Sequence, residues 1–149
     1  MKLGEIAPKD IKALLPYISD YLIKGCDHSF GEVTQGELVD ALFDSKMQLW
    51  VVYDEEKDIR DGRICGIVVT RVGEATSGIN IGEVAIMAGD DIKKWIHLVT
   101  KLEDWARAQG CSKIQAFARK GLVKFLTEWK LTSYILEKDL RDGQEEVRN

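Results

Sequence analysis

Residues 79–109 decide the fold, and they read INIGEVAIMAGDDIKKWIHLVTKLEDWARAQ. Their first part, 79–87, is rich in β-branched and apolar residues and predicts a strand. After Gly89-Asp90-Asp91, apolar residues recur at three- and four-residue steps until Gln109-Gly110, which predicts one long helix with a buried face. The recurring residues are Ile92, Trp95, Ile96, Val99, Leu102, Trp105 and Ala106. A strand that runs directly into such a helix indicates a crossover connection to a further strand.

Two more strands precede this stretch. Residues 48–53 and 64–72 are β-branched and aromatic, and the charged segment between them contains the turn pair Asp61-Gly62, so we expect a hairpin. Residues 64–72 are apolar on both faces for most of their length, which is typical of a central strand covered by helices.

Near the N-terminus, a short strand over 2–6 and two helices are expected. The first helix follows Pro8 and ends at Gly25, with a bend or break near residues 13–15 because Pro16 lacks a backbone donor. The second begins with a capping box, Thr34 to Glu37, and runs to about Asp44.

Downstream of the long helix we expect a strand over 113–118, a short helix over 121–129 and a last strand over 132–138. The order β-α-α-β-β-β-α-β-α-β predicts an α/β fold with a mixed sheet. Residues 1–140 form one domain in this prediction, and 141–149 form a polar C-terminal tail.

Composition limits the function classes. The chain has 149 residues, 45% hydrophobic and 31% charged, which fits a single core. Its formal charge is 21 − 25 = −4, the wrong sign for a protein dedicated to nucleic acid. No run approaches the ~20 apolar residues of a membrane span, and the start lacks a secretory signal, so we expect a cytoplasmic protein without a membrane partner. Cys26, Cys65 and Cys111 match no disulfide or zinc spacing, and we expect no metal.

The predicted order resembles that of the GNAT superfamily of N-acetyltransferases over nearly the whole chain. Residues 125–131 and 134–140 look like the closing helix and strand of that family, and residues 83–88 are similar to the strand that carries the catalytic glutamate in its histone-modifying members. The resemblance implies that two neighbouring strands diverge, here at Met87, and that the pantetheine arm of acetyl-CoA enters between them.

The resemblance also implies a set of cofactor-binding residues. The backbone of Ile86, Met87 and Ala88 would pair with the pantetheine arm, and the pyrophosphate would lie at Gly89 and the first helical turn. That turn comprises Ile92, Lys93 and Lys94. The family's phosphate loop has more glycines, whereas this chain has Asp90 and Asp91 there, which would repel phosphate or, more simply, cap the helix.

Acyl transfer to an amine needs a base, donors for the oxyanion and an acid for the thiolate. Glu83 is the candidate base, with a surface carboxylate on an alternating strand as the alternative. The family's acidic tyrosine corresponds to Leu126, so Tyr134 is the nearest substitute, unless it is a half-buried strand tyrosine. Arg119-Lys120 would meet a phosphate of coenzyme A or form a solvated helix start.

A loop between the first two helices borders the acceptor site in this family, which suggests His28, Phe30 and Glu32 as substrate-loop residues. A nucleophile or metal pair within Cys26-Asp27-His28-Ser29 is the less favoured interpretation, because adjacent loop side chains rarely converge.

Two hypotheses about function stay open. The first is an N-acetyltransferase that uses acetyl-CoA to modify an unknown small-molecule or protein amine. The second is a catalytically degenerate binding or structural module with the same fold, similar to GNAT-like products encoded among virion genes of tailed phages, which would place it in the host cytoplasm or the virion. A homodimer is compatible with either hypothesis.

Overall fold

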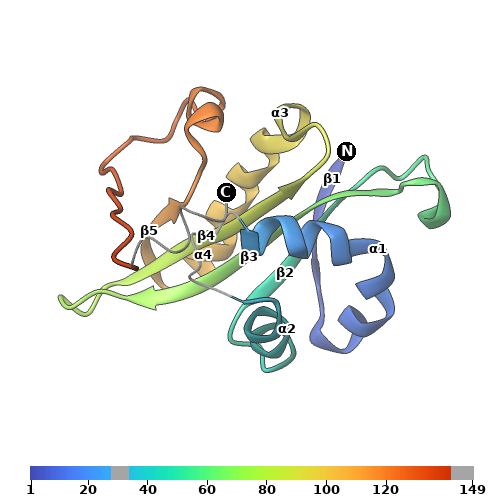
Figure 1. Cartoon of the computed structure of the whole chain (residues 1–149), viewed down its shortest axis with the longest axis horizontal. Helices are drawn as coiled ribbons and strands as arrows, with labels where there is room; N and C mark the ends of the chain where they lie inside the picture. Colours follow the sequence, from blue (N-terminus) through green and yellow to red (C-terminus); the bar gives the residue numbers. More distant parts are fainter. Residues whose placement is uncertain (28–33, 142–149) are drawn as a thin grey trace.

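The computed structural model describes residues 1–27 and 34–141. Its centre is a five-stranded sheet in the order β1-β2-β3-β4-β5. The strands are β1 (Lys2–Ile6), β2 (Gln48–Tyr53), β3 (Ile64–Glu74), β4 (Asn80–Gly89) and β5 (Cys111–Ala116). The first four are antiparallel neighbours and β5 is parallel to β4. This mixed α/β architecture confirms the predicted fold class (Figure 1).

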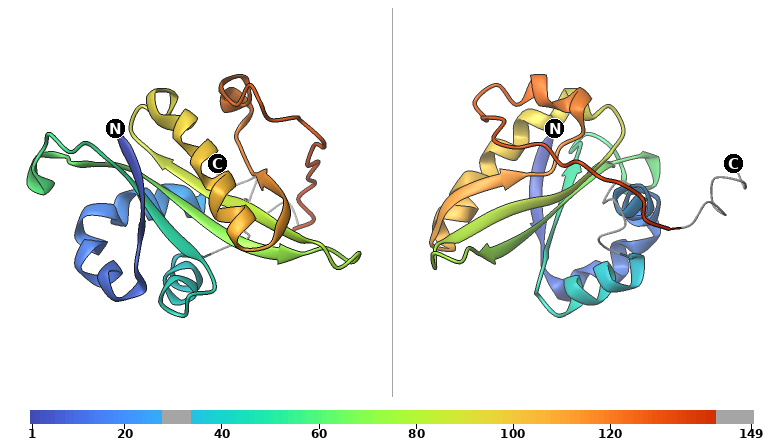
Figure 2. Two further views of the ribbon diagram at one scale, coloured as in Figure 1. Left: turned by 180° about the vertical axis from the view of Figure 1, so that it is seen from behind. Right: turned by 60° about the vertical axis from the view of Figure 1, so that its left-hand side comes forward.

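Helices cover both faces of the sheet (Figure 2). On one face lie α1 (Pro8–Asp27) and α2 (Gln35–Phe43), above a core that includes Leu49, Ile67 and Ile86. On the other face lie α3 (Ile92–Trp95), the 3-10 helix η2 (Ile96–Lys101) and α4 (Leu102–Ala108). Because both faces are covered, β3 is buried along most of its length, as its apolar sequence predicted.

Local signals in the sequence are found where they were expected. The Thr34 hydroxyl accepts a hydrogen bond from the Glu37 amide at 3.2 Å, so the capping box starts α2. In the β2–β3 connection, the 3-10 helix η1 (Ile59–Asp61) ends at Gly62, whose φ of 81° is the left-handed conformation that glycine adopts readily.

The proline in α1 does not break the helix. Helix α1 runs without interruption from Pro8 to Asp27, past the predicted end at Gly25, and its ribbon changes direction along its length (Figure 1). A bend without a break is the milder of the two effects expected of an internal proline.

The long helix after β4 is built differently from the prediction. Residues 92–108 are helical throughout, but the middle six, Ile96–Lys101, form a 3-10 helix. β-branched residues are stiff in a helix, and the Thr100 hydroxyl donates to the His97 carbonyl at 2.8 Å, which competes with regular helical bonding. His97 itself is exposed.

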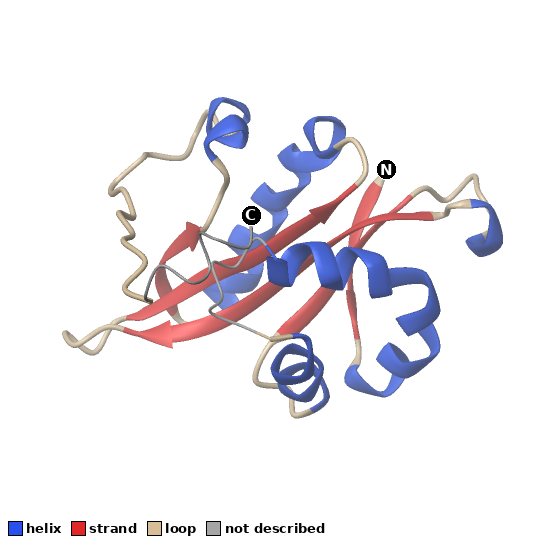
Figure 3. Cartoon of the chain, in the orientation of Figure 1, coloured by secondary structure: helices blue, strands red, loops and turns tan. Residues whose placement is uncertain are grey.

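The end of the chain corrects the predicted order. In place of a helix over 121–129 there is a 3-10 helix, η3 (Lys120–Phe125), followed by a turn in which the Trp129 amide donates to Leu126. Residues 132–138, predicted as the last strand, are extended without a partner strand (Figure 3). Strand-forming residues make a strand only when they pair with a neighbouring strand, and residues 132–138 do not pair with the sheet. Most of the predicted tail lies outside the described residues.

Candidate functional site

Strands β4 and β5 separate halfway along β4. Their pairing runs from Asn80 opposite Cys111 to Val84 opposite Ala116, and the Phe117 amide makes one more bond to the Val84 carbonyl at 3.2 Å. Beyond that point, residues 86–89 pair with β3 only, among the residues that the structure describes. The separation therefore begins at Ala85, two residues before the predicted position at Met87.

A β-bulge accounts for this position. The register between β3 and β4 shifts between Val69 and Thr70, so that Ala85 is the extra residue on β4. A bulge bends its strand and increases the local twist, which turns the end of β4 away from β5.

A pocket occupies the gap between the separating strands. It holds about 370 Å³ of empty space, part of it continuous with solvent. The side chains that line it are apolar except for that of Arg119, and backbone atoms add polar surface. The lining residues are Gly25, Ala85, Ile86, Met87, Phe117, Ala118, Arg119 and Leu122. Ile86 belongs to the core on the α1 side and Met87 to the core on the α4 side, so residues of both faces of the sheet line the pocket. We call this pocket the slot.

Helix α1 approaches the slot closely because it has a glycine there. A methyl group added at Gly25 would lie 2.4 Å from Cγ2 of Ile86, too close for any side chain. The absence of a side chain lets the end of α1 form one wall of the slot.

The turn between β4 and α3 is held by three hydrogen bonds to one residue, Asp90. Its amide donates to the Cys65 carbonyl at 2.8 Å, its carbonyl accepts from Trp95 Nε1 at 2.9 Å, and its carboxylate accepts from the Tyr21 hydroxyl at 2.8 Å. Burial, followed by the bond to Asp90, raises the pKa of Tyr21 well above its usual range. The Asp90 carboxylate is thus directed to α1.

Asp91 is the N-cap residue of α3, as the simpler of the two expectations has it, but no side-chain hydrogen bond caps the helix. Asp91 occupies the N-cap position in a left-handed conformation, without a capping bond, and its carboxylate lies 3.7 Å from Lys94 Nζ. Asp90 instead holds the turn, as described above. Ile92 is buried, so only its backbone is available to a ligand.

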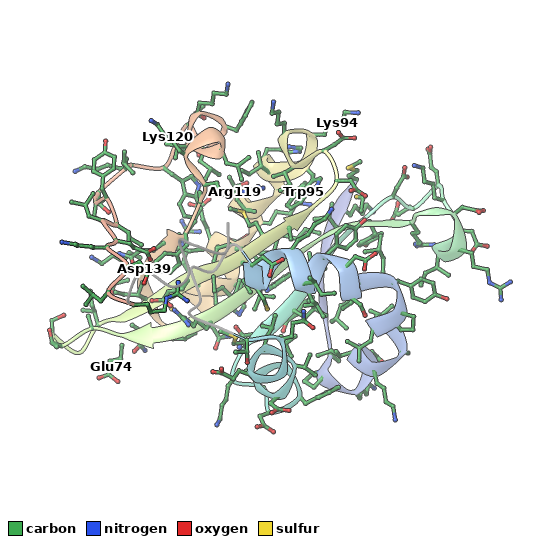
Figure 4. All side chains as sticks on the ribbon, viewed as in Figure 1. Glu74, Lys94, Trp95, Arg119, Lys120 and Asp139 are labelled. Atoms are coloured by element: carbon green, nitrogen blue, oxygen red, sulfur yellow. The ribbon has the colours of Figure 1, made fainter. Side chains whose placement is uncertain are left out.

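Lysines gather near this turn from two elements. Lys93 of α3 and Lys124 of η3 lie over the same Phe125 ring, 5.8 Å and 5.3 Å from its centroid. Lys94 and Lys120 are exposed on the same two elements, and Arg119 precedes η3 (Figure 4). The positive charge lies beyond the slot, at the end of β4.

The structure brings together only some of the predicted site residues. Ile86, Met87 and Arg119 line the slot, and Ala88 and Gly89 continue β4 beyond it. His28, Phe30 and Glu32 lie outside the described residues. Sequence reasoning missed Gly25, Ala85, Phe117, Ala118, Leu122 and Lys124, which the tertiary fold brings to the slot and its basic end.

The two predicted catalytic side chains lie outside the slot lining. Glu83 forms an ion pair with Arg71, its partner across the β3–β4 ladder, and 17% of its side chain is exposed. Its Oε1 would lie 3.2 Å from a methyl group added at Gly73, so the carboxylate leans toward the tip of the hairpin. Tyr134 is 80% exposed on the extended segment after η3 and is neither half-buried nor in a strand.

Residues 1–27 and 34–141 contain neither a membrane-spanning helix nor a metal-binding cluster. Within these ranges no helix combines the length and apolar character that crossing a bilayer requires. The same ranges contain no group of three or more histidine, cysteine, aspartate or glutamate side chains able to hold a metal ion. None of the three cysteines is in a disulfide, and burial raises the pKa of Cys26 and Cys65.

Solved acetyltransferases share this fold. An acetyltransferase from Trypanosoma brucei has a TM-score of 0.62 and 14% identity, covering 93% of this chain and 99% of that chain. Glucosamine-6-phosphate N-acetyltransferase from Arabidopsis thaliana has a TM-score of 0.61 and 16% identity, covering 94% of this chain and 98% of that chain. Ribosomal-protein-alanine N-acetyltransferase from Brucella melitensis has a TM-score of 0.57 and 15% identity, covering 93% of this chain and 99% of that chain. No family model and no curated protein matches the sequence. The chain therefore has the fold of the GNAT acetyltransferases.

Proposed function

We propose that this chain is an N-acetyltransferase that uses acetyl-CoA as the acetyl donor. The slot carries the proposal, because it combines a narrow pocket between β4 and the segment after β5 with β4 backbone that, among the described residues, no strand covers on one side. A pantetheine arm has amides that can pair with an open strand edge and a narrow chain that can enter a pocket between strands. The lysines beyond the slot would neutralise the phosphates of coenzyme A.

The slot also offers an oxyanion donor. Successive amides of a strand point to opposite edges, so one of the N–H groups of Met87 and Ala88 faces the side where β5 is absent. A thioester carbonyl bound there would accept this hydrogen bond, which strengthens as negative charge develops on the oxygen.

The transfer itself would proceed by direct attack. The acceptor amine gives up its ammonium proton to Glu83 through a water, and its nitrogen forms a bond to the thioester carbon. The C–S bond then breaks, the attacking nitrogen loses its second proton to solvent, and the thiolate takes a proton from solvent or from Tyr134, which solvent reprotonates. Because the Glu83 carboxylate pairs with Arg71, this route requires the acceptor or a water to reach the pair from the slot.

Thermal melting with acetyl-CoA tests the proposal. A ligand at 100 times its Kd stabilises the folded state by about 2.7 kcal/mol, which raises Tm by about 5–10 °C in a protein of this size. The control ligand is 3′,5′-ADP, which carries phosphates but no pantetheine arm. No shift with millimolar acetyl-CoA would contradict the proposal. A shift without release of thiol for any amine would point to a binding module of the same fold.

Replacing Glu83 by glutamine tests the base. We expect kcat to fall about 100-fold, since a positioned base contributes a factor of this order, while the Tm shift with acetyl-CoA is unchanged. Thiol release with a reactive amine gives the rate. Glu74→Gln is the matched control, because Glu74 is exposed at the end of β3. Equal rates in the two variants would remove Glu83 from the mechanism.

Replacing Tyr21 by phenylalanine tests the contact that holds Asp90. Loss of one partly exposed hydrogen bond should cost about 1 kcal/mol at pH 7. Because the pKa of Tyr21 is higher in the folded chain than in the unfolded chain, Tyr21 ionises at a lower pH when the chain is unfolded. The free energy of unfolding of the parent chain therefore falls as pH rises above 10. Urea unfolding at pH 7 and 10.5 should show this decline, reduced in Tyr21→Phe. Tyr17→Phe is the control, and a decline of equal size in both variants would assign it to other groups.

A further inference from the structure

Two exposed carboxylates stand at the turn between β4 and α3, beside the lysines that the proposed function assigns to the phosphates of acetyl-CoA. Asp90 and Asp91 come directly before the helix that carries Lys93 and Lys94. Like charges a few ångströms apart repel one another even in water, and a carboxylate beside a lysine also competes with phosphate for it. The direction of each carboxylate therefore affects how well phosphate can bind here.

The structure gives the two carboxylates different partners. The Asp91 carboxylate lies 3.7 Å from Lys94 Nζ, and both side chains are 70% exposed, so the pair is a loose surface contact on the lysine side. The Asp90 carboxylate instead accepts a hydrogen bond from the Tyr21 hydroxyl at 2.8 Å. Asp90 is exposed, and within the described part of the chain this bond is what holds its side chain.

Helix α1 reaches Asp90 because it lies directly on the end of β4. Gly25 follows Tyr21 by four positions, so the two residues share one face of the helix. A methyl group added at Gly25 would lie 2.4 Å from Cγ2 of Ile86 and 3.8 Å from Cβ of Ala88. One helical turn earlier, the same face of α1 brings the Tyr21 hydroxyl to Asp90, the first residue after the strand.

Positive charge near this turn is held on the opposite face of the sheet. Lys93 and Lys124 lie over the ring of Phe125, which packs against the core on the α4 side. Tyr21 packs against the core on the α1 side, so its bond directs the Asp90 carboxylate away from these lysines. Because the amide and the carbonyl of Asp90 make hydrogen bonds of their own, its backbone should keep its position without the Tyr21 hydroxyl.

We propose that Tyr21 is a positioning residue for acetyl-CoA, which holds the Asp90 carboxylate on the α1 side of the turn and keeps it away from the phosphates. This inference rests on the proposed function, since it concerns how the phosphates of acetyl-CoA bind. Without the hydroxyl, the exposed carboxylate is free to turn toward Lys93 and Lys94. It would then repel a phosphate and compete with it for the lysines.

A double-mutant cycle tests this inference, with isothermal titration of acetyl-CoA in 0.1 M NaCl. Tyr21→Phe should raise the Kd about tenfold. When Asp90→Asn is added, the Kd should return to within about twofold of that of Asp90→Asn alone, because no carboxylate is left to be misdirected. A purely structural role of Tyr21 would not be rescued in this way. In 1 M NaCl the Debye length is about 3 Å, so the Kd ratio between Tyr21→Phe and the parent chain should fall below about threefold.

Two controls accompany the cycle. Tyr17→Phe removes an exposed hydroxyl one turn earlier in α1 and should leave the Kd unchanged. Asp91→Asn removes the neighbouring charge, and its effect on the Kd should be the same with and without Tyr21→Phe.

The outcomes distinguish this inference from the proposed function. A parent chain that does not bind acetyl-CoA contradicts the proposed function, and this inference with it. If the parent chain binds, the inference alone is overturned by either of two results. One is a Tyr21→Phe variant that binds as tightly as the parent chain. The other is a weakened Tyr21→Phe variant that Asp90→Asn does not restore.

Discussion

Replacing Ala118 by tryptophan is expected to raise the Kd for acetyl-CoA at least about 100-fold, a loss of about 3 kcal/mol of binding free energy. Ala118 lines the slot opposite the open part of β4 and is only half-buried. An indole ring at this position can turn into the slot and occupy the space that a pantetheine arm would need. Isothermal titration with acetyl-CoA measures the effect directly.

The matched control for this variant is Ala108→Trp, at the exposed end of α4. Both variants add the same side chain, so a difference between them reports the position and not the residue type. The melting temperature of each unliganded variant must remain near that of the parent chain. If Ala118→Trp binds acetyl-CoA as tightly as the parent chain, the thioester does not enter between β4 and β5.

The parts of the fold that could be predicted depend on short stretches of sequence. The capping box at Thr34, the turn at Gly62 and the apolar run of β3 each act through neighbours within a few residues. Such signals survive in the structure because the tertiary contacts agree with them. They were sufficient for the strand order through β5.

The slot could be predicted only as a general feature. Its position follows from a bulge at Ala85, and strand residues carry no clear mark of which of them will be the extra one. The direction of the Asp90 carboxylate is set by Tyr21, which lies 69 positions earlier in the chain. A sequence shows two acidic residues at that turn, but it does not show that one of them belongs to a contact with α1.

The unpaired segment 132–138 shows the opposite situation, in which a strong local pattern finds no partner within one chain. Strand propensity measures how well a residue fits a paired, half-buried surface. A segment with high strand propensity therefore does not form a strand without a partner.

Replacing Trp95 by alanine is expected to cause the largest loss of stability, about 3–5 kcal/mol and therefore a fall in Tm of about 10 °C or more. Trp95 is completely buried, and its indole N–H donates to the Asp90 carbonyl at 2.9 Å. The ring packs on two glycines: methyl groups added at Gly66 and Gly89 would lie 2.7 Å and 3.1 Å from its Cζ2 atom.

Two further variants separate the contributions of this tryptophan. Trp95→Phe keeps an aromatic ring but removes the donor to Asp90, so we expect an intermediate loss, measured by urea unfolding. Gly66→Ala leaves the tryptophan in place and forces it to move, which should cost about 1–3 kcal/mol. Trp129→Ala, at a half-buried position after η3, is the control and should be milder than Trp95→Ala. If Trp95→Ala and Trp129→Ala unfold at the same urea concentration, the contact between Trp95 and the two glycines does not hold α3 at the end of β4. The position of the proposed phosphate site must then depend on other contacts.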